Sequence, residues 1–293
     1  MFTKENNKRK ILKLFSIFVI LIPGVFFVLF LIFIKIFDVE NRLLYHPTYD
    51  IKPIISELKG KTEIKSFYTS DNVKITFWHI KGSKNKPAIV FCHGHYFNVS
   101  YFQSKVTFLT QKGYEVYMLD YRGFGKSQGT PNEKGLYTDL ESFIKYLDKS
   151  GIHQSRIVLW GHSLGGAVVT NTAARHKFKG VILESTFTNI NDIKILSADS
   201  LKNPHDGYFD VLYTNFIKSM PINQQFDNSK KIGRITSPLL IIHSENDEII
   251  PVKMAYKLAK LNPKAELYIS ETGNHDSLGW QNTPILDFLN SLE

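Results

Sequence analysis

From about residue 62 onward, apolar runs of strand length alternate with segments of helical period. Strands that alternate with helices build a mostly parallel sheet covered on both faces. The expected core strands are residues 88–92, 115–119, 156–160, 180–183, 239–243 and 266–269. The expected helices are residues 101–112, 133–149, 164–176, 253–261 and 283–292. An antiparallel hairpin, 63–68 with 73–80, precedes them. The pattern predicts one α/β domain over residues 63–293.

One interval, from residue 186 to about residue 231, interrupts this alternation. It is rich in Asp, Asn and Phe. It is also too long for a plain connection between a strand and a helix. We therefore expect this interval to form a small cap over the sheet.

The N-terminal segment has a different character, because residues 14–34 carry no charge over 21 positions. As a helix, this stretch matches a bilayer hydrocarbon core of about 30 Å. We predict a transmembrane helix at 14–36, between a basic cytoplasmic N-terminus (1–13) and a juxtamembrane segment (37–62). The alternative is a cleaved signal peptide, but the apolar run is long and no small-residue cleavage site follows it. More basic residues precede the span than follow it, which places the domain on the side of the membrane opposite the N-terminus.

The net charge of +9 comes largely from this segment. Residues 1–36 hold six basic residues and one acidic residue, so 30 basic and 26 acidic residues remain, a net charge of +4. This excess is spread along the chain, which argues against a nucleic-acid partner. The one cysteine, Cys92, excludes an internal disulfide and a cysteine-based metal site. The sequence leaves the oligomeric state open.

Residues 161–165, GHSLG, form a G-x-S-x-G motif. The motif lies between the expected strand 156–160 and an expected helix that begins at Leu164. A residue on such a sharp turn has a strained backbone, and flanking glycines allow the close approach that the turn requires. The helix N-terminus also directs free N–H groups toward developing negative charge. Ser163 is therefore the candidate nucleophile, and the alternative is a glycine-rich turn with an incidental serine.

Three further segments accompany the motif: FCHG at 91–94, DYRGFGKS at 120–127 and IIHSENDEIIP at 241–251. They resemble the oxyanion loop, the D-x-R-G-x-G-x-S segment and the acid-bearing strand end of the alpha/beta-hydrolase superfamily. The resemblance extends over residues 64–292. It is closest to short-cap, membrane-anchored esterases and thioesterases, a branch that includes acyl-protein depalmitoylases and relatives grouped with serine aminopeptidases. It implies the alpha/beta-hydrolase fold and a serine hydrolase.

The resemblance also implies the chain order nucleophile, acid, histidine. Of the ten histidines, His275 alone follows the expected strand 266–269, so it is the candidate general base. Asp247 follows the expected strand 239–243 and is the candidate acid that orients the base. Three other carboxylates stay open as alternatives for the acid: Glu184, Glu245 and Glu248.

The oxyanion hole of this fold combines two backbone N–H groups. The expected donors are Leu164 and His95. The family often has a small residue or asparagine where this chain has His95-Tyr96, which leaves the second donor open. Three further polar residues are expected to support the site instead of reacting: His93, His162 and Arg122.

The expected reaction is two-step acyl transfer. Ser163 attacks an ester or thioester carbonyl, His275 protonates the leaving group, and water then releases the acid. No metal or organic cofactor is expected, and the expected partner is a small-molecule or lipid-like acyl substrate at a membrane. A peptidase or an acyltransferase with the same triad, and a non-catalytic binding protein, are the alternatives. Aromatic residues of the expected cap suit either an acyl pocket or ordinary packing: Phe187, Tyr208, Phe209, Tyr213 and Phe216.

Overall fold

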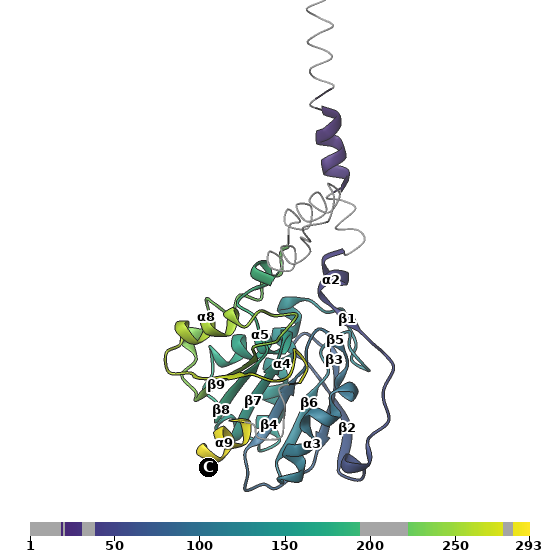
Figure 1. The fold of residues 1–293 in the computed structure, drawn as a ribbon. Helices are drawn as coiled ribbons and strands as arrows, with labels where there is room; N and C mark the ends of the chain where they lie inside the picture. Colours follow the sequence, from purple (N-terminus) through teal and green to yellow (C-terminus); the bar gives the residue numbers. More distant parts are fainter. Residues whose placement is uncertain (1–18, 20, 31–38, 194–221, 278–283) are drawn as a thin grey trace, which may run out of the picture. The chain divides into compact units, whose positions relative to one another are not determined.

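The computed structural model describes residues 19, 21–30, 39–193, 222–277 and 284–293, which belong to two compact units, residues 1–45 and residues 46–293 (Figure 1). In the first unit, residues 21–30 are helical and helix α2 covers Val39–Leu44. Within the described ranges, no helix combines the length and apolar composition needed to cross a membrane. Of the expected span at 14–36, residues 19 and 21–30 are described, and the other residues lie outside the described ranges.

The second unit is built on a sheet whose described strands follow the order β10-β9-β8-β7-β4-β6-β3-β2 (Figure 1). Strand β3 pairs antiparallel with both of its neighbours, and the other neighbouring strands pair parallel. The strands are β2 (Thr62–Tyr68), β3 (Lys74–Ile80), β4 (Ala88–Cys92), β6 (Glu115–Leu119), β7 (Ile157–His162), β8 (Gly180–Glu184), β9 (Leu239–Ser244) and β10 (Glu266–Ser270). The prediction of a mostly parallel sheet is confirmed.

The central strands are apolar because they are covered on both faces. Every residue of β4, β6, β7, β8 and β9 is buried, as expected for parallel strands between two layers of helices. The edge strand β10 is mostly exposed. Packing on both faces holds the central strands in place. The residues of the candidate site lie at or just after the ends of these strands.

Helices cover both faces of the sheet. On one face, α3 (Gln103–Gln111) and α9 (Pro284–Ser291) share a core cluster with Trp78 of β3. The neighbouring residue Phe77 points to the opposite face, where its ring lies 4.8 Å from that of Phe143 in α4. The remaining helices are α4 (Glu133–Lys149), α5 (Leu164–Ala173), α8 (Lys253–Leu261) and the 3-10 helices η1 (Ser56–Leu58), η2 (Val99–Tyr101), η3 (Gln154–Arg156) and η4 (Ile232–Arg234).

The expected helices at 133–149 and 253–261 agree with α4 and α8. Helix α5 is shorter than expected, since it ends at Ala173 and not at residue 176. The N–H groups of Arg175 and His176 both donate to the carbonyl of Thr172. The bond from Arg175 spans three residues, which is 3-10 spacing, so the chain leaves regular α-helical geometry after Ala173.

The expected juxtamembrane segment, 37–62, is divided between the two units. His46–Pro47 forms strand β1, which pairs parallel with β5 (Tyr96–Phe97). Leu58 is fully buried, and Ile54 and Ile55 pack against the core. Residues 46–62 thus belong to the unit that carries the sheet.

Much of the expected cap, residues 194–221, lies outside the described residues, and so do its candidate acyl-pocket residues Tyr208, Phe209, Tyr213 and Phe216. The two described flanks contact each other, because Ile190 N–H donates to the carbonyl of Gln225 over 2.9 Å. Gln225 N–H also donates to Glu133 Oε2 of α4 over 2.7 Å. The cap itself stays a prediction.

Candidate active site

Ser163 lies on the turn between β7 and α5, where the G-x-S-x-G motif predicted a strained residue. Its backbone has φ 53° and ψ −118°, and its side chain is buried. A positive φ is costly for a residue with a Cβ, so the surrounding structure must hold it. The N–H of Ser163 donates to the carbonyl of Glu184, and Thr186 Oγ1 donates to the carbonyl of Ser163 over 2.7 Å. Strand β8 and the residues after it therefore hold the turn.

The two motif glycines permit the close approach that this turn needs. A Cβ on Gly161 would collide with the backbone of Gly165, and a Cβ on Gly165 would collide with the carbonyl of Cys92 at the end of β4. The steric reason for the motif is thus visible at both positions.

Three predicted side chains meet in one hydrogen-bonded row. His275 Nε2 lies 3.0 Å from Ser163 Oγ. On the other side of the ring, His275 Nδ1 lies 2.8 Å from Asp247 Oδ2 and 3.0 Å from Oδ1. All three side chains are buried. A proton on Nδ1 that is donated to Asp247 leaves the Nε2 lone pair directed at the Ser163 hydroxyl.

Asp247 follows β9 and is held as a carboxylate. Its Oδ1 accepts N–H hydrogen bonds from Ile249 and Ile250 over 2.9 and 2.7 Å. His243 Nε2 lies 3.1 Å from Oδ2. Burial raises the pKa of the Asp247 carboxyl, but hydrogen bonds from His243 and His275 outweigh burial and bring the pKa below its usual range.

The three alternative acids do not reach Nδ1 of His275. Glu245 and Glu248 are exposed, and Glu248 contacts only the backbone N–H of His275, over 3.4 Å. Glu184 is buried but faces other partners. The geometry therefore singles out Asp247 as the carboxylate beside the histidine.

A second buried network lies beside the row. Lys105 of α3 donates to Glu184 Oε1 over 2.6 Å and to the backbone carbonyl of Asp276 over 3.0 Å. Glu184 Oε2 accepts from Trp160 Nε1 over 3.0 Å and lies 3.6 Å from His162 Nδ1. Burial raises the pKa of Glu184, but the charge of Lys105 and the contact with His162 outweigh it, and the pKa falls to about 2.

The predicted oxyanion residues flank Ser163. Leu164 is the first residue of α5, so its N–H has no acceptor within the helix. His95 follows Gly94, and a Cβ on Gly94 would lie 3.4 Å from Ser163 Cβ. The loop that carries His95 thus passes close to the nucleophile. The assignment of both N–H groups to an oxyanion hole stays a prediction.

His93 and Arg122 contact the backbone and carboxylates, not the reacting row. His93 Nδ1 lies 2.7 Å from the carbonyl of Gly94, and burial lowers the pKa of His93 to about 3. A neutral imidazole that donates from Nδ1 fixes this loop. Arg122 donates to Asp139 Oδ1 over 2.8 Å and to Asp71 Oδ2 over 2.9 Å, and so ties its loop to the domain as expected.

Ser163 opens onto a cavity of about 440 Å³. Aromatic side chains dominate one wall, and Tyr96 and Phe97 are exposed at its edge. Its lining, among the described residues, consists of Gly94, His95, Tyr96, Phe97, Tyr101, Phe102, Ser104, Lys105, His162, Ser163, Ile249, His275, Asp276 and Ser277. The site is therefore open to a ligand with a substantial apolar part.

Two residues of this region were missed by sequence reasoning. Lys105 is buried, as is its neighbour Val106. The sequence gives no sign of this, because a lysine in a helix is ordinarily exposed. Asp276 is exposed and lies next to His275, and its Oδ1 is 3.4 Å from His162 Nε2. Its place in the loop of His275 was the one available indication.

The sheet order and the buried serine turn define an alpha/beta hydrolase. A family model described as "Serine aminopeptidase, S33" matches residues 83–229, and one described as "alpha/beta hydrolase fold" matches residues 208–281. The uncharacterized protein YfhR of Escherichia coli is 30% identical over 87% of this chain and 87% of its own length. The chain belongs to the serine aminopeptidase S33 family of alpha/beta hydrolases, which confirms the resemblance to the alpha/beta-hydrolase superfamily.

Two further proteins are similar to this chain. The lysophosphatidylserine lipase ABHD12 of Danio rerio is 34% identical over 52% of this chain, which spans 41% of that relative's length. The esterase Pf2001 of Pyrococcus furiosus superimposes with a TM-score of 0.67 at 21% identity, over 85% of this chain and 98% of its own. At this level of identity, the similarity to the esterase shows a shared fold alone.

Proposed function

We propose that this protein is a serine hydrolase that cleaves carboxylic ester or thioester bonds of acyl substrates. The observation that carries the proposal is the continuous row from Ser163 Oγ through the imidazole of His275 to Asp247, with contacts of 3.0 and 2.8 Å. A serine hydroxyl is a weak nucleophile until a base accepts its proton, and a carboxylate holds that base in the productive tautomer.

The reaction proceeds in two steps. The Ser163 oxygen bonds to the carbonyl carbon as its proton passes to His275 Nε2, and a tetrahedral intermediate forms. His275 then returns that proton to the leaving alcohol or thiol as the carbon–leaving group bond breaks. Water, deprotonated by the same nitrogen, attacks the acyl carbon; the bond from that carbon to Ser163 Oγ then breaks, His275 returns the proton to Oγ, and the acid leaves.

Negative charge on the intermediate requires donors that are already in place. We assign this role to the N–H groups of Leu164 and His95. Donors of this kind are each worth about 3 kcal/mol of barrier. Asp247 stabilises the imidazolium that forms when His275 holds the proton.

A lipid-like acyl substrate fits the cavity, whose wall contains Tyr96, Phe97, Tyr101 and Phe102. Aromatic side chains offer a large apolar surface to an acyl chain. The names of two similar proteins, a lysophosphatidylserine lipase and an esterase, also favour ester substrates.

We also propose that residues 14–36 anchor the protein as a single membrane span, with the N-terminus in the cytoplasm and the hydrolase unit across the membrane. The uncharged stretch at 14–34 and the basic residues before it support this arrangement. Alkaline extraction of membranes tests it: the full chain should stay in the pellet, and protease added on the side opposite the cytoplasm should digest the hydrolase unit.

A second candidate function is that of a serine peptidase that removes N-terminal residues. It is favoured by the description of the matching family as a serine aminopeptidase. The same serine, histidine and aspartate would act on an amide carbonyl, so the choice between the two rests on the substrate.

A substrate panel tests the proposal. The purified full chain is assayed against acyl esters of graded chain length, acyl thioesters and aminoacyl amides. We expect medium or long esters or thioesters to be cleaved fastest, and Ser163→Ala to lose at least about 10³-fold in kcat. Ser104→Ala, which removes a hydroxyl from the same cavity, should keep hydrolysing. Preference for aminoacyl amides would favour the peptidase, and equal activity of Ser163→Ala would overturn both candidates.

A further inference from the structure

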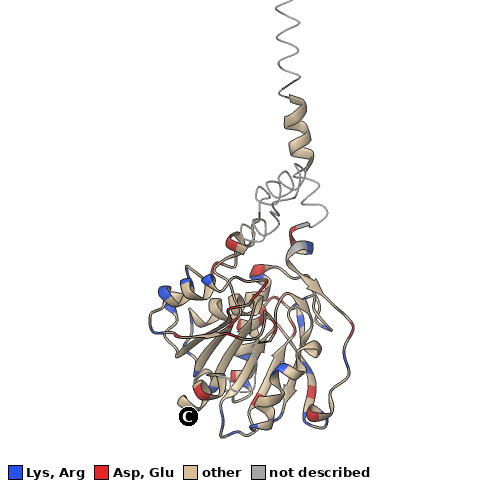
Figure 2. Ribbon diagram, in the orientation of Figure 1, with Lys and Arg blue, Asp and Glu red and all other residues tan. Residues whose placement is uncertain are grey.

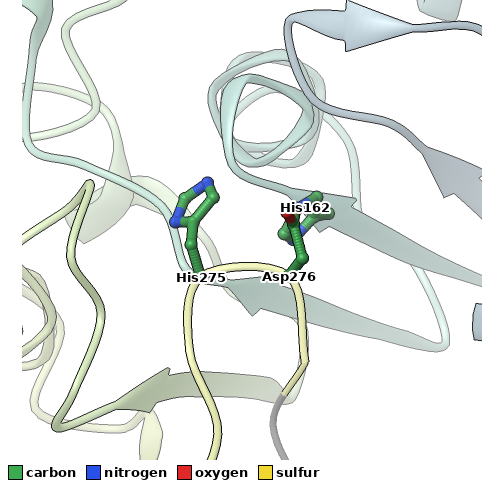
Figure 3. Close-up of side chains that lie close together, drawn as sticks. All are labelled: His162, His275 and Asp276. Atoms are coloured by element: carbon green, nitrogen blue, oxygen red, sulfur yellow. The ribbon is translucent and has the colours of Figure 1, made fainter.

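Two imidazoles and one carboxylate meet beside the nucleophile, and the geometry points to a binding site for one zinc ion. His275 and Asp276 come from the same loop after β10, and His162 comes from the end of β7 (Figure 3). One ligand atom from each of the three lies within 4.8 Å of the other two. Bound there, Zn²⁺ would switch the enzyme off.

The Nδ1 of each histidine lies near a buried carboxylate, within hydrogen-bond distance for His275 and just beyond it for His162. His275 Nδ1 lies 2.8 Å from Asp247 Oδ2, and His162 Nδ1 lies 3.6 Å from Glu184 Oε2. Histidines that bind zinc usually donate the other ring N–H to a carboxylate or carbonyl, which fixes the tautomer and strengthens the ligand. A metal on the two Nε2 atoms would replace the contact of His275 with the Ser163 hydroxyl and that of His162 with Asp276.

The space between His162 and Asp276 favours a cation. In the tautomer with its proton on Nε2, His162 donates to Asp276 Oδ1 over 3.4 Å; in the tautomer that a metal requires, with the proton on Nδ1, the Nε2 lone pair faces that oxygen and the two acceptors repel each other. A positive ion between them removes this repulsion. The side chain of Asp276 is exposed, so an ion from solvent has direct access to the site.

The spacing suits a tetrahedral ion. Zinc binds nitrogen and oxygen ligands at about 2.0–2.2 Å, which places two ligands of one ion about 3.3 Å apart. The pair His162 Nε2 and Asp276 Oδ1 is already close to this separation. The third ligand atom, on His275, lies within 4.8 Å of these two, so its ring has to move toward them before all three can bind one ion.

The ligand set selects zinc over the common hard cations. Two imidazole nitrogens and one carboxylate suit Zn²⁺, whereas Mg²⁺ and Ca²⁺ take oxygen ligands. Copper and nickel also accept imidazole, and they bind such sites by the same donors. We take Zn²⁺ as the ion, and Co²⁺ as a probe whose visible absorption reports its coordination.

Zinc at this site would inhibit hydrolysis, a consequence that rests on the proposed function. An ion on His275 Nε2 occupies the lone pair that accepts the proton of Ser163. It also breaks the 3.0 Å contact between those two atoms. The nucleophile then has no base.

Binding is measured first on Ser163→Ala, which separates the site from the reaction. Zn²⁺ is titrated into the full-length protein by calorimetry, and Co²⁺ absorption is recorded in parallel. We expect one ion per chain in tetrahedral coordination. Asp276→Asn and His162→Gln should each weaken binding by at least about tenfold. His153→Gln is the matched control, because His153 lies 2.6 Å from Asp148 in an exposed pair elsewhere and should have no effect.

Inhibition is then measured on the wild type. Zn²⁺ should abolish ester hydrolysis, a chelator should restore it, and Asp276→Asn should raise the inhibitory zinc concentration by about the same factor as its binding constant. If Ser163→Ala does not bind zinc, the proposed site is overturned, and a hydrogen bond alone joins His162 and Asp276. Binding unaffected by Asp276→Asn would do the same. Zinc binding by a protein with no hydrolytic activity would leave the site standing and overturn the proposed function.

Discussion

Two buried carboxylates lie at the ends of the neighbouring strands β8 and β9, Glu184 as the last residue of β8 and Asp247 just after β9, and each faces an imidazole, but their surroundings differ. Glu184 forms an ion pair with Lys105 at 2.6 Å, so its charge is balanced before His162 is considered. The ionic partners of Asp247 among the described residues are the histidines His243 and His275. Asp247 therefore keeps a negative charge that a protonated His275 can balance.

Under the proposed reaction, this difference gives Asp247 a part in proton transfer and leaves Glu184 a supporting part. A carboxylate already paired with an ammonium gains little when a neighbouring imidazole is protonated. A carboxylate whose ionic partners are imidazoles gains more from that protonation, and the proposed proton transfer from Ser163 to His275 requires this stabilisation. The acidic and basic residues of the hydrolase unit are interspersed along its elements (Figure 2). The difference between Glu184 and Asp247 therefore comes from their immediate partners and not from an excess of one charge on a whole face.

The largest effect is expected when Asp247 is neutralised. Asp247→Asn should lower kcat/KM for an activated ester by about 10⁴-fold, because an amide favours the wrong tautomer of His275. Glu184→Gln should lower it by no more than about tenfold. Steady-state kinetics on both variants, with circular dichroism to verify folding, makes the comparison. Equal losses would erase the distinction between the two carboxylates.

Removal of the Lys105 ammonium should lower the free energy of unfolding. Lys105→Met leaves Glu184 buried without its cation, and breaking a buried pair in this way costs about 3–5 kcal/mol. Urea denaturation measures the loss, and Lys105→Met combined with Glu184→Gln should recover part of it. The control is Lys257→Met, which breaks an exposed pair with Asp192 and should cost less than about 1 kcal/mol. Similar costs for the two lysines would contradict a special role for Lys105.

A smaller effect is expected in the pH dependence of stability. The pKa of Glu184 falls from 4.5 to about 2 on folding, so the folded state binds fewer protons between these values than the unfolded state. The stabilisation from this carboxylate is present above pH 4.5 and is lost as the pH falls toward about 2. The advantage of wild type over Glu184→Gln in unfolding free energy should therefore narrow as the pH is lowered. An advantage that stays constant or grows would show that Glu184 does not titrate in this way.

The smallest effect is expected at the exposed carboxylate beside the row. Glu248→Gln should change kcat/KM by less than about threefold, because an exposed side chain outside the row contributes little. The assay is the one used for Asp247→Asn. A loss of the size expected for Asp247→Asn would move the acid of the site to Glu248.

The sheet was predictable because each element leaves its own period in the sequence. Strands such as β4 are uninterrupted apolar runs, and α4 has an amphipathic pattern over its whole length. Strands β1 and β5 have two residues each and leave no pattern, and their pairing depends on a contact across 50 positions. For this reason residues 46–62 looked like a linker.

The candidate site was predictable where a local constraint acts on the chain. The glycines around Ser163 reveal a sharp turn, and chain order in the resembled superfamily led to Asp247 and His275. The network of Lys105 and Glu184 leaves no such trace, since it joins residues 79 positions apart. Only the tertiary structure shows that Glu184 contacts Lys105 and not His275.

The most direct test of the proposed row is to locate the residue that a fluorophosphonate modifies. This probe forms a phosphorus–oxygen bond to an activated serine with loss of fluoride, and peptide mass spectrometry identifies the serine. We expect one adduct, on Ser163, which is absent from Ser163→Ala and forms far more slowly in Asp247→Asn. An adduct on a different serine, or undiminished labelling of Ser163→Ala, would contradict the assignment of Ser163 as the nucleophile.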